Sequence, residues 1–219
     1  MSRVREKIVN AALDRFHALG FNACGVQEIV DKAGVPKGSF YNYFKTKELL
    51  ALEVIEIYAR GSKREMLADT RVPPVERLHA HFEFLAGRYK EFGYEKGCLL
   101  GNLAAESSGA APLIQQTIAQ SLTMWTALVA SAIREGQADC SIVPELNADE
   151  VARFMINSWE GAVVRMKLAN SRQPLDDFFA VAFRLLRQPS SAQPAPKRSS
   201  TGPVSSRSRG ASESKLSAA

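Results

Sequence analysis

The sequence predicts an all-α fold, in which an N-terminal three-helix domain of the helix-turn-helix type precedes a larger helical domain. Apolar residues recur at spacings of three and four along most of the first 188 residues, as on the buried face of an amphipathic helix. No segment shows the strict apolar and polar alternation of a half-buried strand. Near the N-terminus, two short helical segments flank Gly34-Val35-Pro36, a connection of helix-turn-helix length.

The first two helices are predicted from apolar spacing and from the glycines that end them. Gly20 ends the first helix and Gly34 the second, because glycine tolerates the left-handed conformation of a helix stop. The second helix, over 26–33, has half a capping box at its start, with Glu28 three residues after Gly25. The first helix, over 4–19, has one apolar stripe: Ile8, Ala12, Phe16 and Leu19.

A third helix is expected over 37–44, because Pro36 suits the start of a helix. In a helix-turn-helix domain the second helix of the motif enters the DNA major groove, so this segment is the candidate recognition helix. Its free backbone N–H groups and positive dipole end favour phosphate, and Gly38 lets the backbone approach DNA closely.

The remaining helices form a predicted effector-binding and dimerisation domain over 48–188. Thr46 is the expected N-cap of a long helix that reaches residue 70, and Asn147 caps a later one. The last two helices have more apolar surface than one subunit can cover. Residues 148–187 are therefore expected to form a four-helix bundle with a second copy of the chain. A charge introduced at Phe178 or Phe179 should then separate the subunits. The other helices are expected over 75–92, 98–107, 114–135, 148–169 and 174–186.

Charge is distributed unevenly along the chain. The formal net charge is +5, of which residues 1–47 contribute +4, residues 48–188 contribute −3 and residues 189–219 contribute +4. A basic head on a mildly acidic body suits a head that meets a polyanion. The final segment is rich in Ser, Ala, Pro and Gly, so it is predicted to be a disordered basic tail.

Several classes of protein are excluded by composition and motifs. The charged N-terminal residues lead into an amphipathic pattern rather than a signal peptide, and no apolar run approaches the roughly 20 residues that span a bilayer. We therefore expect a cytoplasmic protein with no membrane contact. The three cysteines form no CxxC pair and no ligand spacing with histidine, so neither a metal site nor another cofactor is expected. No convergent set of catalytic residues emerges, which argues against an enzyme.

Residues 34–48 read Gly-Val-Pro-Lys-Gly-Ser-Phe-Tyr-Asn-Tyr-Phe-Lys-Thr-Lys-Glu and resemble the signature of the DNA-binding domain of TetR-family transcription regulators. The resemblance is close over 4–49 and departs at Cys24-Gly25, where the family usually has a hydroxyl pair. It implies a bacterial regulator, commonly a repressor, that binds a palindromic double-stranded DNA operator as a homodimer and is released by a small-molecule effector. The alternative is a helical protein–protein interaction module that does not bind DNA.

The resemblance also implies a DNA-binding role for individual residues of the head. An alternative for an isolated Tyr-Asn-Tyr-Phe segment is that the tyrosines pack the small head and the lysines are solvated. With Gly38 at the helix start, the implied set has Lys37, Ser39 and Asn42 at base edges, Tyr41, Tyr43 and Lys47 at phosphates, and Gln27 at either.

Residues 96–106, Lys-Gly-Cys-Leu-Leu-Gly-Asn-Leu-Ala-Ala-Glu, are similar to a subgroup of this family that includes the repressor of the N-ethylmaleimide reductase operon. The resemblance implies that Cys98 senses electrophiles or oxidants. A cysteine at a helix start beside Lys96 would also have its thiolate stabilised by the dipole and the cation. The alternative is a buried cysteine that fills space as a small apolar side chain.

Further candidates for the effector site come from the long helices. Asn102 and Glu106 follow Cys98 at spacings of four, and Arg165 is a third possible polar anchor. Aromatic and sulfur-containing residues of these helices could line an effector cavity: Trp125, Trp159, Met124, Met155, Phe82 and Phe154. The alternative is that these residues are plain core or dimer contacts.

Overall fold

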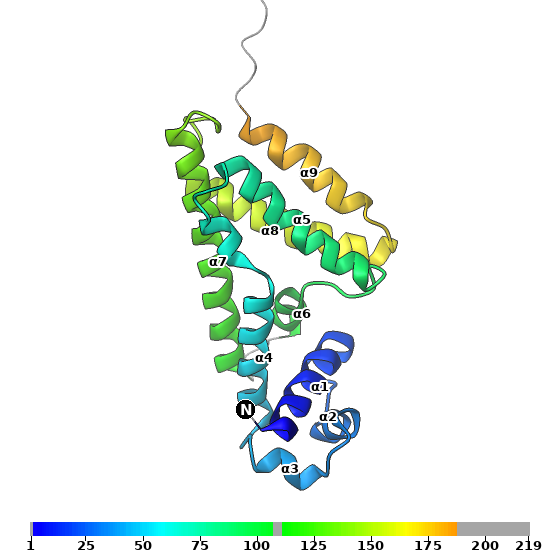
Figure 1. Cartoon of the computed structure of the whole chain (residues 1–219). Helices are drawn as coiled ribbons and strands as arrows, with labels where there is room; N and C mark the ends of the chain where they lie inside the picture. Colours follow the sequence, from blue (N-terminus) through cyan, green and yellow to red (C-terminus); the bar gives the residue numbers. More distant parts are fainter. Residues whose placement is uncertain (1, 107–110, 188–219) are drawn as a thin grey trace, which may run out of the picture. The chain divides into compact units, whose positions relative to one another are not determined.

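The computed structural model describes residues 2–106 and 111–187, so the tail predicted over 189–219 lies outside the described residues. Across the described ranges the chain is helical and contains no strand, which confirms the all-α prediction (Figure 1). The elements in chain order are α1 (Arg3–Leu19), α2 (Val26–Ala33), α3 (Lys37–Tyr41), α4 (Lys47–Gly61), the 3-10 helix η1 (Arg64–Ala68), α5 (Pro74–Glu91), α6 (Leu99–Glu106), α7 (Pro112–Ala138), α8 (Ala148–Ala169) and α9 (Gln173–Leu186).

Helices α1–α3, which we call the head, enclose a small apolar core. Phe16 of α1, Ile29 of α2 and Phe40 of α3 are fully buried in it. An ion pair fixes the head to α4, because the Arg5 guanidinium donates to both carboxylate oxygens of Glu53 at 2.7 and 2.5 Å. Figure 1 shows α4 leaving the head and running beside α7.

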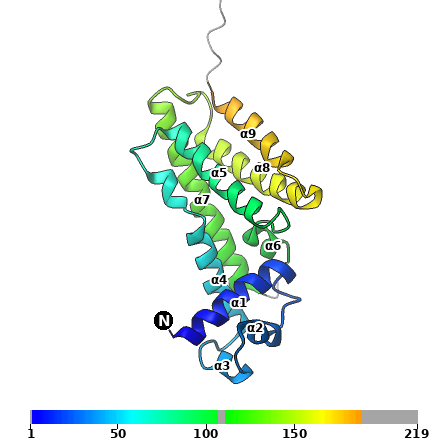
Figure 2. The ribbon, with the colours of Figure 1, turned by 45° about the vertical axis from the view of Figure 1, so that its right-hand side comes forward.

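Helices α5–α9, which we call the body, pack around the larger part of the core, which is continuous with that of the head. Phe82 of α5 lies 5.0 Å from the ring of Trp159 on α8 and 5.0 Å from that of Phe178 on α9, centroid to centroid. The short helix α6 of the body contacts α1 of the head, and it also contacts α4 and α7 (Figure 2). No helix in the described ranges combines the length and apolarity needed to cross a bilayer.

The predicted start signals are found in the structure. Thr46 Oγ1 accepts from the backbone N–H of Leu49, and Asn147 Oδ1 accepts from two N–H groups at the start of α8. The half capping box is present too, because the Gly25 N–H donates to Glu28 Oε2 at 2.9 Å. The bounds of α2 and α8 match their predictions.

Two predicted helices end early. The third was expected to reach Phe44 but ends at Tyr41, because the next N–H groups turn back to the Phe40 carbonyl. The fourth was expected to reach residue 70 but ends at Gly61, where the Ser62 hydroxyl donates to a carbonyl of the last turn and Lys63 adopts a left-handed φ of 49°. Spacing alone did not reveal this break, since η1 continues the apolar pattern.

Candidate DNA interface and effector site

Helix α3 and the turn after it combine buried aromatic anchors with exposed polar side chains. Phe40 and Phe44 are buried with ring centroids 5.8 Å apart, whereas Tyr41 is 57% exposed. Because α3 packs against α2 and α1 through its buried side, the side chains between the two phenylalanines are largely exposed. Most of the predicted DNA-contact set is exposed, namely Gln27, Lys37, Gly38, Tyr41, Asn42 and Tyr43, while Ser39 is half-buried.

The exposed tyrosines have contacts within the head. The Tyr43 hydroxyl lies 2.9 Å from Ser2 Oγ, and the Tyr41 ring packs edge-on against Phe40 at 5.2 Å. Gln27 donates to Asp31 Oδ1 on the same helix at 2.8 Å. All three side chains therefore keep polar atoms at the surface while their stems are fixed, which limits the entropy lost on binding a partner.

Lys47 binds backbone carbonyls of the head, whereas its predicted role was to bind a DNA phosphate. Its ammonium donates to the carbonyls of Phe21 and Cys24 at 2.7 and 2.9 Å and lies 4.1 Å from the centre of the Phe21 ring. Two of its three N–H bonds are thus committed to the turn between α1 and α2. The structure assigns Lys47 a role in fixing that turn, which contains the fully buried Cys24.

The expected activation of Cys98 by Lys96 is wrong. The Lys96 ammonium donates to Asp14 Oδ1 of α1 at 3.0 Å and lies over the Phe92 ring. The Cys98 side chain instead lies beside the Glu160 carboxylate of α8, and the backbone N–H groups of Leu100 and Gly101 lie near its sulfur. Burial and the nearby carboxylate raise the pKa of Cys98 well above its usual range, although the α6 N–H groups act in the expected opposite direction.

Cys98 lies in a polar cluster that the body buries. Burial raises the pKa values of Tyr58 and Tyr89 as well, and both residues line the same cavity as Cys98. The cluster borders a cavity of about 20 Å³, room for a single water molecule. We call this set the polar cluster; its members are Tyr58 of α4, Arg64 of η1, Tyr89 of α5, Cys98 before α6 and Glu160 of α8.

Arg64 lies between this cavity and a groove at the surface. Its guanidinium donates to the backbone carbonyl and hydroxyl oxygens of Ser121 at 2.8 and 3.1 Å and lies 5.3 Å from the Trp125 ring centre. It also borders an open groove of about 370 Å³ between α4 and α7, which Met124 lines. Arg64 therefore separates the Cys98 cavity from a larger solvent-facing groove.

The two predicted tryptophans have different surroundings. Trp125 lines the Cys98 cavity, and its indole N–H donates to His81 Nε2 at 2.8 Å. Burial and the Arg64 charge lower the pKa of His81 to about 4, so its imidazole is neutral and accepts this bond. Trp159 does not line the cavity; it packs in the aromatic core with Phe82 and Phe178, which favours the core alternative over an effector contact.

Asn102 and Glu106 do not line the cavity either. Asn102 lies beside Gly97, and the exposed Arg165 is no anchor. Glu106 turns to the head, where its Oε2 accepts from the Asn22 N–H at 3.0 Å and its carbonyl accepts from the Asn22 side chain at 3.1 Å. Helical spacing placed both residues on the face of Cys98, but the packing of α6 against α1 sends them elsewhere.

The segment around Cys98 has two more links to α1. His17 Nε2 donates to the Gly97 carbonyl at 2.6 Å, and burial lowers the pKa of His17, which keeps the ring neutral. The Lys96–Asp14 pair is the other link. Residues before Cys98 are thus bonded to α1, and Glu106 after it is bonded to the turn that follows α1.

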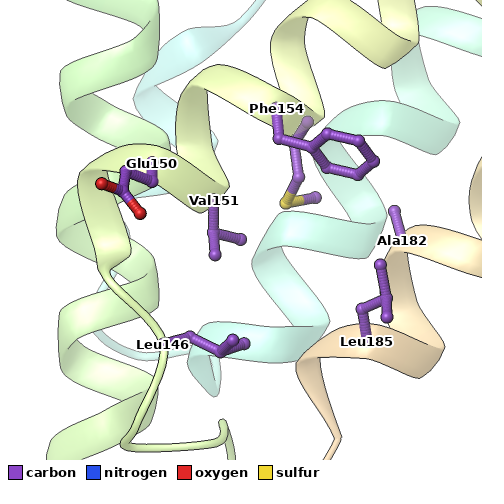
Figure 3. Close-up of a pocket in the computed structure, with 7 residues that line it drawn as sticks. Leu146, Glu150, Val151, Phe154, Ala182 and Leu185 are labelled. Atoms are coloured by element: carbon purple, nitrogen blue, oxygen red, sulfur yellow. The ribbon is translucent and has the colours of Figure 1, made fainter.

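A groove of about 230 Å³ lies between α8 and α9 and is lined by apolar side chains (Figure 3). Phe154 and Leu185, on opposite walls, are half exposed, and Leu168 is 76% exposed. Phe178 is buried within the subunit, so a charge there would disturb the subunit's own core as well as any dimer contact. The uncovered apolar residues of the two helices are Phe154, Val164, Leu168, Val181 and Leu185.

Sequence reasoning missed Tyr58, Arg64, Tyr89 and Glu160. None of the four was singled out as a site residue by motif or spacing. A signal for Glu160 existed, since it is a carboxylate on the otherwise apolar side of α8, flanked by buried Trp159 and Val163. Among the described residues, no group of three or more potential ligands is arranged to hold a metal ion.

A three-helix head with an exposed polar α3, joined to a helical body, defines a helix-turn-helix transcription regulator. Residues 8–54 match the family model described as bacterial regulatory proteins of the tetR family, and residues 74–182 match the tetracyclin repressor-like C-terminal domain. The chain therefore belongs to the TetR family; it is a DNA-binding transcription regulator and not an enzyme.

Individual relatives support this family assignment. The transcriptional repressor DhaR of Mycobacterium sp. strain GP1 is 36% identical, over 84% of this chain and 92% of the repressor. The repressor NemR of Escherichia coli K12 is 26% identical, over 78% and 87%, which supports the predicted subgroup. The crystal structure of regulatory protein TetR from Rhodobacter sphaeroides aligns with a TM-score of 0.79 at 30% identity, over 84% of this chain and all of that one.

Proposed function

We propose that this protein represses transcription by binding a palindromic operator as a homodimer, and that a small electrophile or ligand at Cys98 releases it. The observation that carries the proposal is the set of bonds on both sides of Cys98 to the head, through Gly97 and Glu106. A change at the cysteine is thereby connected to the helices that present the candidate DNA contacts. A chromosomal operator would place this action in the cytoplasm.

The DNA contacts are proposed at the exposed polar residues of the head. Lys37, Ser39 and Asn42 would reach base edges, and Tyr41, Tyr43 and Gln27 would bind phosphate or base. Lys47 would act mainly by fixing the turn before α2, and only its third N–H remains for phosphate. A single head reads too few base pairs for useful specificity, so two heads are needed.

The second head would come from a copy bound at α8 and α9. Leu185 lines the groove between these helices (Figure 3), and the exposed Leu168 lies near the C-terminal end of α8. Self-association through such a face gives a symmetric four-helix contact. Leu168→Glu and Leu185→Glu should produce monomers in sedimentation and weaken operator binding, whereas Arg153→Glu, at another exposed position of α8, should leave a dimer.

Release would follow from the size of the cavity. Its volume of about 20 Å³ cannot hold an adduct on the Cys98 sulfur, so modification must displace a neighbouring element. Helix α6 is short and bears the Glu106 contacts, so its displacement would disturb the head. The effector must favour the released state, since equal affinity for both states would shift nothing.

The test is operator binding in a mobility-shift assay before and after treatment with N-ethylmaleimide. Wild type should bind its own upstream region and be released, whereas Cys98→Ser should bind and stay bound. Cys24→Ser and Cys140→Ser are the matched controls and should respond as wild type does. An unchanged response of Cys98→Ser would exclude a thiol-dependent mechanism, and no DNA binding by wild type would favour an interaction module instead.

A further inference from the structure

The polar cluster contains a carboxylate that the sensing role of Cys98 leaves unexplained. Glu160 lies on α8 with its carboxylate against the start of α6, and its Oε1 has no hydrogen-bond partner among the described residues. A buried carboxylate without full pairing costs free energy that an apolar residue would save. Its position next to Gly101, beside the Cys98 side chain, suggests a chemical purpose.

A thiol in this place does not react readily by itself. Only the thiolate is strongly nucleophilic, and the pKa of Cys98 is raised so far by burial and by Glu160 that little thiolate exists near pH 7. Reaction with an electrophile therefore requires that the thiol proton leave as the new bond forms. Burial also raises the pKa of Glu160, which makes its carboxylate a better proton acceptor.

The geometry points to Glu160 as the proton acceptor that turns Cys98 into a nucleophile toward small neutral α,β-unsaturated carbonyl compounds. This inference deepens the proposed function and rests on it. In the addition, the thiol proton moves to the Glu160 carboxylate while sulfur bonds to the β-carbon, and the double-bond electrons move to the carbonyl oxygen. Glu160 then returns the proton to the α-carbon, which leaves a thioether and the original carboxylate, with no oxidant needed.

Other members of the polar cluster suit the same addition. Negative charge passes from Glu160 to the carbonyl oxygen, and the Arg64 guanidinium borders the same cavity as Cys98 and can stabilise it. The N–H groups of Leu100 and Gly101 stabilise the developing charge on sulfur. Tyr58 and Tyr89 face the site as neutral hydroxyls, so Glu160 and Arg64 are the charged groups around the thiol.

A glycine lets the two reacting groups meet. A Cβ on Gly101 would lie 2.5 Å from Glu160 Oε2 and 3.8 Å from the Cys98 Cβ. Alanine there must push the carboxylate away, although it should favour the helix itself. Gly97 is the matched control, because a Cβ there would meet its nearest neighbours at 3.5 and 3.6 Å, which is ordinary contact.

The experiment measures alkylation rates of individual cysteines in native full-length protein by acrolein, using mass spectrometry of the Cys98 and Cys140 peptides. The exposed Cys140 reports acrolein reactivity in the same molecule. In wild type, the Cys98 rate should fall as Glu160 becomes protonated at acidic pH and be nearly flat above that range. In Glu160→Gln it should drop at least about tenfold at pH 7 and then rise about tenfold per pH unit, as for an unassisted thiol.

Further outcomes support or overturn the inference. Gly101→Ala should slow Cys98 as Glu160→Gln does, and Gly97→Ala should not, with the Cys140 rate and the thermal unfolding profile as checks on folding. A Glu160→Gln variant that reacts as fast as wild type or faster would overturn the inference, because Glu160 would then only suppress the thiolate. An unreactive Cys98 in wild type would overturn it as well. Glu160-dependent alkylation that leaves the operator bound would refute only the proposed function.

Discussion

The head and the body handle their polar groups in opposite ways. In the head, the core is apolar, and the polar side chains proposed to act, such as Lys37 and Asn42, are at the surface. In the polar cluster, which packs against the body, Arg64 and Cys98 line a small cavity and the Glu160 carboxylate lies beside Cys98. An outward-facing set suits a rigid surface that reads a large partner. An inward-facing set suits a small partner, at a cost in stability that the body's aromatic core offsets.

The largest effect is expected in the head core. Phe40→Ala removes a fully buried ring that packs on Tyr41 and Phe44, so the free energy of unfolding should fall by about 3–5 kcal/mol. Tyr41→Ala, one position on, should change it by less than about 1 kcal/mol and weaken operator binding instead. Urea unfolding and mobility shifts measure the two effects. Equal stability of both variants would show that α3 is not anchored as described.

A smaller effect is expected where the head meets α6. Gly20 has a φ of 82°, and a Cβ there would lie 1.8 Å from Glu106 Oε1, so Gly20→Ala should cost about 1–3 kcal/mol. Adding Glu106→Ala should recover part of that loss, which a double-mutant cycle measures. Gly34→Ala is the control, since its φ is 64° but no atom lies within 4 Å of the added Cβ. It should lose stability with no recovery from Glu106→Ala.

In the body, replacing a polar residue should raise the free energy of unfolding rather than lower it. Glu160→Met replaces a buried carboxylate by an apolar side chain of similar length and should raise the free energy of unfolding by about 1 kcal/mol. The same variant should lose the response of operator binding to electrophiles. Thermal or urea unfolding beside wild type checks the sign. A clear destabilisation would mean that Glu160 has a mainly structural role and that the contrast between the two regions is wrong.

The smallest effect concerns the Asp14–Lys96 pair, which is partly exposed. The Lys96 ammonium lowers the pKa of Asp14 from 3.8 to about 2. The folded state thus binds the proton less well than the unfolded state, so the stabilisation is present above pH 4 and is lost as pH falls towards 2. Asp14→Asn should cost less than about 1 kcal/mol at pH 7, because solvent screens the pair, and close to nothing at pH 2. A pH-independent difference would point to lost packing instead.

Much of the fold could be predicted because its signals are local. The bounds of α2 and α8, the caps at Thr46 and Asn147 and the apolar core of the head follow from periodicity and from hydrogen bonds between near neighbours in sequence. The break after Gly61 was missed because the apolar spacing continues across it, and only tertiary packing holds Lys63 in its left-handed conformation.

The sequence by itself determined the all-α fold, the exposed recognition segment and the position of Cys98 at a helix start. Tertiary structure decided what surrounds that cysteine. Lys96, two positions away, binds the head, while Glu160 comes from a distant helix and sets the chemistry of the thiol. The physical reason is that the pKa of a buried group depends on burial and on charges within a few ångströms. Those neighbours come from α4, η1, α5 and α8, which only the folded chain brings together.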